Sequence, residues 1–505
     1  SRERGWLERC QPVRGRLFAG SGQRQTMATG FVSDVEKPPT ALEPSAAAAS
    51  PSTAVLVRRL WWLMLFVGFA IVEFVSVGPS TQYIILTFFA SYHGGGDCER
   101  TPSSGPCRAA AGNAALYTGV SSGICSCVGA VMALSLGSVS DRLGRRPVLR
   151  LRTWLSLLPV ATLALHVFHG QTLWLFLIAS PVFRVFDISG VLLAVITDLV
   201  PEKTARASAI GFFITFCITT VMATLPLAGL LPMHTLVLIS LAATVMKLMF
   251  VYTVLPESSL SMSGEQELKD VFSTPVVALR VFLRHGFIFR MAFVLVFSSL
   301  GFAGVNTVLA PYLTAYLSLT RAEGSGLLLS SVVSGAFGLA IGVGPLVANF
   351  GEIGALQACL ALATAFPLLL VACTTPGQVC FLASILGAPL FMLAPIISGI
   401  KSNLVTQDEQ GLVQGGLACI ANLATAIADV MFGFLYMYAT EHGTTKSRSS
   451  VFPLFFICAS LTGASWLLAL SLPRRLPPPL AWSSKVAGVS IVAPLLGEGA
   501  AVSTA

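Results

Sequence analysis

The stretch GSVSDRLGRRP, from Gly137 to Pro147, separates two long apolar segments of this chain. One aspartate and three arginines stand where the first apolar segment ends and the second begins. Guanidinium groups clustered beside long apolar segments are typical of the cytoplasmic boundary of a membrane. The stretch therefore predicts a short, positively charged turn between two membrane-spanning helices.

The composition agrees with a membrane protein. Charged residues make up 11% of the 505 residues and apolar residues 54%, and the mean hydropathy is +0.79. Soluble globular proteins carry roughly 25% charged residues, so this chain has too few charges to cover a water-exposed surface. We expect an integral, multi-pass membrane protein.

Apolar windows of about 20 residues, the length a helix needs to cross a bilayer, recur along the chain. Because lipid offers no partner to unpaired backbone groups, these windows are expected to be helices. The twelve predicted spans are 60–82, 113–136, 148–168, 172–198, 207–231, 234–255, 287–309, 322–347, 355–374, 377–400, 412–437 and 452–472.

Basic residues predict how the chain is oriented. The connectors after the second, fourth, sixth and tenth spans carry roughly eleven Lys and Arg, against roughly five on the other side. These connectors and both termini are therefore expected in the cytoplasm. The net charge of +8 is explained by this distribution, so nucleic acid is not an expected partner.

The cysteines and histidines show no metal-ligand spacing, and neither a metal nor a cofactor is expected. Cys98 and Cys107 lie together in the polar loop 92–112 on the non-cytoplasmic side. An oxidising compartment would favour a disulfide between them. Two free thiols in a mobile loop are the alternative.

The chain divides at its polar segments. Residues 1–59 are expected to be a disordered cytoplasmic tail, in which Met27 is a candidate start. Residues 60–255 form a first bundle of six helices, 256–286 a cytoplasmic linker and 287–472 a second bundle. Residues 473–505 are expected to be a second disordered cytoplasmic tail.

The two bundles show a faint internal repeat. Gly344 and Gly351 after the eighth span correspond to Gly137 and Gly144 after the second, although the charges between them are lost. The segment 199–211 similarly matches 404–416, each between the fourth and fifth span of its half. Two short matches at corresponding positions favour a duplicated architecture.

With these features the chain resembles the major facilitator superfamily over about residues 60–472, nearest its branch of tetracycline-exporter-like and hippocampus-abundant-transcript-like proteins. The fold implied is all-α, with twelve transmembrane helices in two pseudo-symmetric six-helix bundles. The matching stretches are the 137–147 turn, LPES at 255–258, Asp198 with Arg206, the helix 10–11 motif of Gln410, Gly411, Gln414 and Gly415, and Glu73-Phe74.

Two departures weaken a specific prediction of drug efflux. In the fifth span, only Pro226 and Gly229 remain of the glycine-rich motif of drug antiporters. In the fourth span, Arg184 is not soon followed by the glycine that antiporters usually carry.

The charged turn is interpreted as a conformational latch. Its glycine allows close helix approach, and its arginines can bridge to acids at the cytoplasmic helix ends. The bridge would hold the two halves together while the carrier faces outward. Alternatively, the arginines only set topology and touch lipid phosphates. The predicted latch residues are Gly137, Asp141, Arg142, Gly144, Arg145, Arg146, Asp198 and Arg206.

Ionisable residues near the middle of a span are costly and indicate function. Glu73 is the preferred proton carrier, whereas a static ion pair that fixes packing is the alternative. Lys247, in the peripheral sixth span, can snorkel instead. The predicted solute and proton cavity contains Glu73, Arg184, Asp187, Asn306 and Asp429.

Together these features predict a secondary active transporter of a small organic solute, working by alternating access and coupled to protons. The alternative is a sensor or trafficking receptor that does not transport. An enzyme is not expected, because catalytic motifs are missing from the sequence. The expected partners are the solute, protons and the lipid bilayer of a plasma or organelle membrane, with the chain as a monomer.

Overall fold

The computed structural model describes residues 53–95, 97–184, 191–192, 195–196, 199–200, 203–255, 286–404, 410–442 and 448–473. Side chains are described throughout these ranges except at 53–57, 133–143, 182–184, 203–208, 402–404, 410–414 and 442. Most of the predicted tails and nearly all of the predicted linker therefore lie outside the described residues.

Twelve α-helices make up almost all of the described chain, together with three short 3-10 or π segments. The α-helices are α1 (Thr53–Ala90), α2 (Gly105–Leu143), α3 (Arg145–His169), α4 (Trp174–Arg184), α6 (Lys203–Leu230), α7 (Met233–Thr253), α9 (Gly286–Leu317), α10 (Arg321–Phe337), α11 (Val343–Ala372), α12 (Pro376–Leu404), α13 (Gln410–His442) and α14 (Phe452–Leu470).

Each predicted span corresponds to one of these helices. Ten described stretches are long and apolar enough to cross a membrane. The stretch Arg321–Ala372 holds two helices, α10 and α11, and α4 is described over only 11 residues. Most helices extend beyond the predicted spans at one end or both, whereas α14 ends two residues before its span; residues 53–59, predicted as tail, are helical. The hydropathy signal covers only the part of a helix that crosses the bilayer. A span predicted from hydropathy therefore tends to be shorter than the whole helix.

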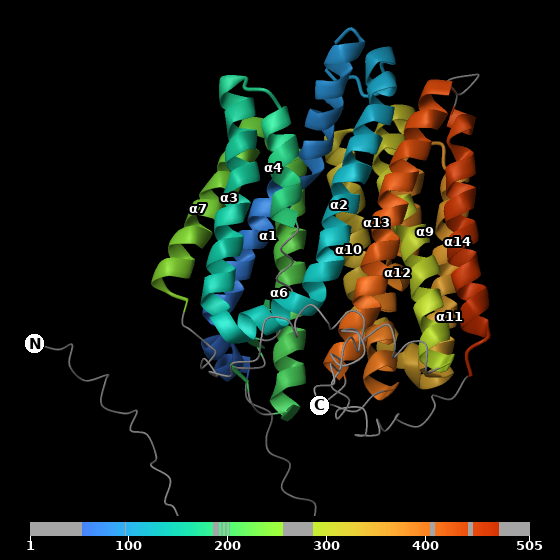
Figure 1. Cartoon of the computed structure of the whole chain (residues 1–505). Coiled ribbons are helices and arrows are strands. Elements are labelled where there is room, and N and C mark those ends of the chain that lie inside the picture. The colour runs from blue at the N-terminus through green and yellow to red at the C-terminus, as the bar shows by residue number, and fades with distance from the viewer. Residues whose placement is uncertain are drawn as a thin grey trace, which may run out of the picture. The chain divides into compact units, whose positions relative to one another are not determined.

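The helices form two six-helix bundles, one of α1 to α7 and one of α9 to α14 (Figure 1). In the first bundle α1 packs on α6 and α7, and α3 packs on α4 and α7. In the second bundle the corresponding helix α9 packs on α13 and α14, and α11 on α12 and α14. The same pairing in both bundles gives the protein its pseudo-twofold symmetry.

The turns after the second helix of each bundle have the same backbone conformation. Gly144, between α2 and α3, has φ 91° and ψ 155°. Gly351 has φ 71° and ψ 170° at a kink within α11, so residues 321–350 before this kink correspond to the second helix of the second bundle. A positive φ of this kind favours glycine, because a Cβ would clash with the backbone. The two glycines matched by the internal repeat thus occupy equivalent turns.

At one end of the molecule, the described buried core is shared between the bundles. At the end that carries Cys98 and Cys107, here called the disulfide end, one apolar cluster includes residues of both bundles. At the opposite end, which carries Gly144 and is called the signature end, each bundle has its own cluster. Among the described residues, apolar packing therefore joins the bundles at the disulfide end.

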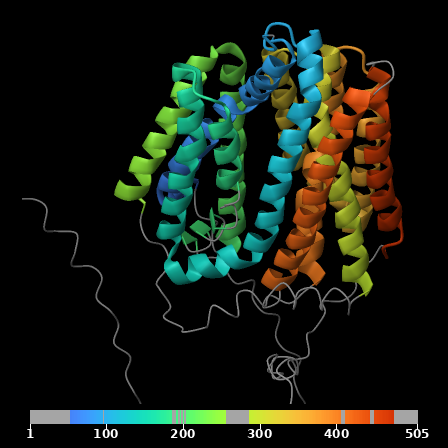
Figure 2. The same cartoon turned by 45° about the horizontal axis from the view of Figure 1, so that its top comes forward.

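The bundles meet chiefly along α2 and α13, which run side by side (Figure 2). Small residues allow this close approach. A Cβ on Gly433 of α13 would lie 2.9 Å from the carbonyl oxygen of Ala115 on α2. A Cβ on Gly119 of α2 would collide with the carbonyl oxygen of Asp429 on α13. Gly119 and Gly123 have the spacing that membrane helices use for such contacts.

We expect Gly119→Ala to destabilise the protein by about 1–3 kcal/mol, because the added methyl group forces α2 and α13 apart. Gly129→Ala on the same helix is the matched control, since nothing lies within 4 Å of a Cβ there. Thermal unfolding in detergent should show a lower Tm for the first variant only. Equal Tm values for the two variants would contradict the close contact.

Candidate functional site

A cavity of about 620 Å³ lies between the two bundles. Helices α1, α2, α3, α4 and α6 line it on one side, and α9, α10 and α13 on the other. Most lining side chains are aliphatic or aromatic. The described acidic residues in the lining are Glu73 of α1 and Asp429 of α13. Within the described part of the chain, each bundle therefore contributes one carboxylate to a largely apolar chamber.

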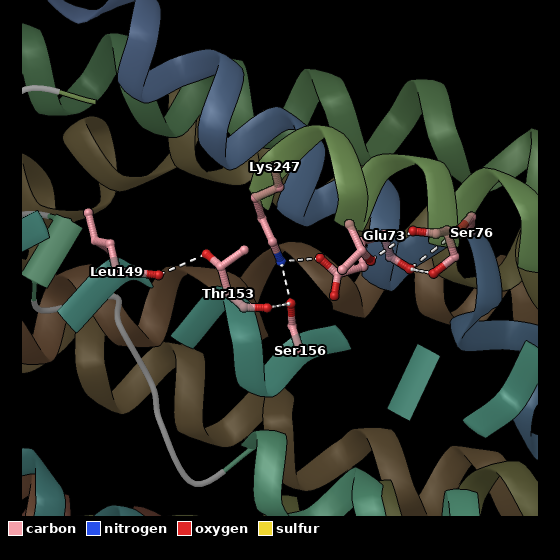
Figure 3. A network of polar contacts seen from close by, with 8 residues as sticks. Glu73, Ser76, Leu149, Thr153, Ser156 and Lys247 are labelled. Atoms are coloured by element: carbon pink, nitrogen blue, oxygen red, sulfur yellow. Dashed lines mark hydrogen bonds and ion pairs between the residues drawn. The ribbon is translucent and has the colours of Figure 1, made fainter. Parts of the chain in front are cut away.

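Glu73 is paired inside the first bundle (Figure 3). The ammonium of Lys247 on α7 donates to Glu73 Oε2 and forms an ion pair with it. The same ammonium donates to Ser156 Oγ on α3 at 2.8 Å. Glu73 and Lys247 are each 3% exposed. A buried charge is costly unless it is paired and hydrogen-bonded, and the contacts between Lys247, Glu73 and Ser156 meet this requirement.

The backbone beside Glu73 is also fixed by side-chain hydrogen bonds. Ser240 Oγ of α7 donates to the Glu73 carbonyl oxygen at 2.9 Å, and Ser76 Oγ donates to it at 3.3 Å. Ser156 Oγ donates onward to the Thr153 carbonyl of its own helix at 2.8 Å (Figure 3). The network joins α1, α3 and α7 at the wall of the cavity.

Asp429 lies in the second bundle, within the α2–α13 contact. Thr307 Oγ1 of α9 donates to Asp429 Oδ1 at 2.9 Å, and Asp429 is 4% exposed. Asn306, the preceding residue on α9, is exposed and also lines the cavity. Asn306, Thr307 and Asp429 thus provide a group of hydrogen-bonding atoms from two helices.

At the signature end, described arginines bind α7 of their own bundle. Arg146 donates to the carbonyl oxygens of Tyr252 at 2.6 Å and Val251 at 3.4 Å. The Arg150 guanidinium lies 4.7 Å from the centre of the Tyr252 ring, and Trp154 Nε1 donates to Tyr252 Oη at 2.9 Å. Cations near the C-terminus of a helix are stabilised by its dipole, which accounts for the position of Arg146.

Several predicted site residues cannot be placed. Asp187 and Asp198 lie outside the described residues. A further group lies on helices whose side chains are outside the described part, namely Gly137, Asp141, Arg142, Arg184, Arg206, Gln410, Gly411 and Gln414. Gly144, Arg145 and Gly415 are described, and Arg145 is buried beside the turn. The structure therefore brings Glu73, Asn306 and Asp429 to one cavity, while the predicted latch stays a prediction.

Lys247 is the residue whose role the sequence least indicated. Its ammonium does not snorkel toward the membrane surface but lies buried against Glu73, 174 positions away in the chain. The available signal was general: a basic residue in the middle of an apolar span requires an acidic partner. The sequence showed several acids at similar depth and could not select among them.

Cys98 and Cys107 form a disulfide, with both residues fully buried. The bond joins the loop between α1 and α2 to the first turn of α2. Among the described residues, His, Cys, Asp and Glu form no group that could hold a metal ion.

The family model described as Major Facilitator Superfamily matches residues 109–428. No curated protein matches the sequence. The human organic anion transporter MFSD10 (TETRAN) superposes with a TM-score of 0.58 at 17% identity, covering 83% of this chain and 100% of that one. A D-xylose-proton symporter superposes with a TM-score of 0.60 at 14% identity, covering 84% of this chain and 100% of that one.

The nucleoside transporter NupG gives a TM-score of 0.57 at 14% identity, covering 83% of this chain and 98% of that one. These likenesses show the fold and do not carry over the solute of any of these proteins.

We expect Lys247→Met to destabilise the protein by about 3–5 kcal/mol, because it leaves the Glu73 carboxylate buried without its cation. Adding Glu73→Gln removes that charge, so the double variant should be more stable than Lys247→Met alone. A double-mutant cycle of unfolding free energies measures the coupling. Additive effects of the two substitutions would contradict a coupled pair.

Proposed function

Because the chain belongs to the major facilitator superfamily, a family of membrane transporters, we propose that it is a secondary active transporter of a small organic solute. The cavity of about 620 Å³ between the bundles is the observation that carries this proposal. Both bundles line it, so rocking one bundle against the other would expose it to either side in turn. Alternating access of this kind needs no nucleotide or covalent step.

The lining supports an amphipathic solute of moderate size. Apolar side chains dominate it, and hydroxyl and amide groups from both bundles give directional contacts. Cavities of roughly 300–1,000 Å³ with few polar groups are typical of sites for small organic molecules. The solved transporters of similar fold are described as carriers of organic anions, xylose and nucleosides, so the fold itself does not select a solute.

Proton coupling is proposed to run through Glu73. Its carboxylate lines the cavity and also pairs with Lys247. Protonation would neutralise the carboxylate and release the ammonium, which changes the contact between α1 and α7. A proton bound at the cavity wall is thereby linked to helix packing within one bundle. The static ion pair is the competing role, and transport measurements separate the two.

At the signature end, a cytoplasmic latch of Gly137, Asp141, Arg142, Gly144, Arg145, Arg146, Asp198 and Arg206 remains our proposal. The positive φ of Gly144 supports it by setting the tight turn that presents the arginines. The bonds from Arg146 to α7 carbonyls would anchor the turn to its own bundle. The Cys98–Cys107 disulfide supports a non-cytoplasmic location for the opposite end, where oxidation is possible.

Reconstitution into liposomes with an imposed pH gradient tests the transport proposal. Labelled sugars, amphipathic drugs and organic anions are offered, and uphill uptake of one class is expected. Binding without flux for every class would favour the receptor alternative.

Glu73→Gln should abolish uphill uptake driven by the pH gradient while sparing exchange of solute, because the amide cannot carry the proton. Glu441→Gln, an exposed position at the end of α13, is the matched control and should leave uptake unchanged. Uptake that still follows the pH gradient in Glu73→Gln would assign the proton to another residue.

Asp141→Asn and Arg145→Ala should each give a folded, membrane-inserted protein with slow turnover, because they weaken the proposed latch. Initial transport rates at saturating solute are compared with those of the unaltered chain. Unaltered rates in both variants would exclude the latch role.

A further inference from the structure

Arg321 is the first residue of α10 and reaches from the second bundle to two parts of the first. Its Nη2 donates to the carbonyl oxygen of Leu231, in the α6–α7 connector, at 2.8 Å. Its Nη1 lies 3.1 Å from Glu99 Oε1, in the loop between α1 and α2. The Arg321 side chain is 11% exposed. One guanidinium thus joins both bundles at the disulfide end.

A second bond between the bundles involves a residue two positions before this arginine and lies at the cavity wall. Tyr83 Oη of α1 donates to the Leu319 carbonyl oxygen, just before α10, at 2.8 Å. Both Tyr83 and Leu319 line the cavity, and both are buried. Tyr83 and Leu319 therefore form part of the cavity wall, and the Arg321 contacts lie next to this wall in the chain.

The chain holds Arg321 in place although its position at a helix start is electrostatically unfavourable. Cations are disfavoured at a helix N-terminus, where the dipole is positive. Thr320 and Glu323 form a capping box: Glu323 Oε2 accepts the Thr320 N–H at 2.8 Å, and Thr320 Oγ1 accepts the Glu323 N–H at 3.4 Å. The box fixes the start of α10, so Arg321 is presented to the other bundle.

The disulfide holds the acidic partner. Glu99 directly follows Cys98, and the Cys98–Cys107 bond ties this stretch to the start of α2. Asp97 Oδ1 accepts the Glu99 N–H at 3.1 Å, which shapes the local turn. Arg100 points elsewhere, since its ion pair is with Asp97 and its side chain is 87% exposed.

We propose that Arg321, Glu99, the Leu231 carbonyl and the Tyr83–Leu319 bond form a latch that closes the cavity at the disulfide end, with the Cys98–Cys107 disulfide holding Glu99 in register. The shared apolar cluster at this end completes the closure. The latch must break before the cavity can open there, so it opposes the proposed latch at the signature end. The inference rests on the proposed alternating access.

Thiol labelling from the disulfide end tests the latch. Thr118, in the cavity wall, is replaced by cysteine, and its modification by a membrane-impermeant maleimide is timed in oriented vesicles. The chain without the introduced cysteine gives the background from native thiols. Glu99→Gln and Arg321→Gln should each raise the rate by about fivefold, the factor expected for losing a partly exposed ion pair.

Arg100→Gln is the matched control, because it removes a positive charge from the same end without breaking a contact between bundles. The charge reversal Glu99→Arg with Arg321→Glu should lower the rate only part of the way, because it restores the ion pair but not the donor to the Leu231 carbonyl. Single variants that label no faster than the control would overturn the proposal. If the charge-reversed protein is labelled as fast as the single variants, the two charges act separately. This result would overturn the proposed ion pair.

The double variant Cys98→Ser with Cys107→Ser tests the disulfide. It should label as fast as Glu99→Gln, because the acidic partner is no longer held in register. If this variant is labelled at the rate of the unaltered protein, the disulfide has no role in the latch. Labelling reports opening whether or not a solute has been identified, so a failed latch and a failed transport proposal give different results.

Discussion

The close contact between α2 and α13 determines the arrangement of the rest of the molecule. Two membrane helices gain little from apolar burial against each other, because lipid is as apolar as their side chains. They associate where small residues let the backbones approach, as at Gly119 and Gly433. This contact places Asp429 at the wall of the cavity, while most of the other helices pack on neighbours within their own bundle.

Within this frame the charged groups are placed by the need for partners. In an apolar interior a charge without a partner costs several kcal/mol, so Glu73 requires Lys247. The pair lies inside one bundle, whereas Arg321 and Glu99 pair between bundles. A pair within a bundle can respond to a proton without moving the bundles, and a pair between bundles must break when they separate. These differences are the reason that we propose a coupling role for the first pair and a gating role for the second.

Much of the fold could be predicted from the sequence, because membrane insertion imposes a simple rule of about 20 apolar residues per helix. The predicted spans correspond to helices, and the match between Gly144 and Gly351 anticipated two turns with the same backbone conformation. The helix ends were predicted less well, since parts of a helix outside the lipid carry no hydropathy signal. Of the candidate cavity residues, Glu73, Asn306 and Asp429 do line one chamber.

The sequence by itself determined the membrane class, the helices and the duplicated plan, because hydropathy, charge asymmetry and glycine turns are local properties. Only the tertiary structure decided which charges meet. Lys247 lies far from Glu73 in the chain, and Arg321 lies far from Glu99, so their pairing depends on how α7 packs on α1 and on how the bundles close. Such contacts are set by the packing of whole helices, and the pattern of hydropathy and charge along the sequence does not predict that packing.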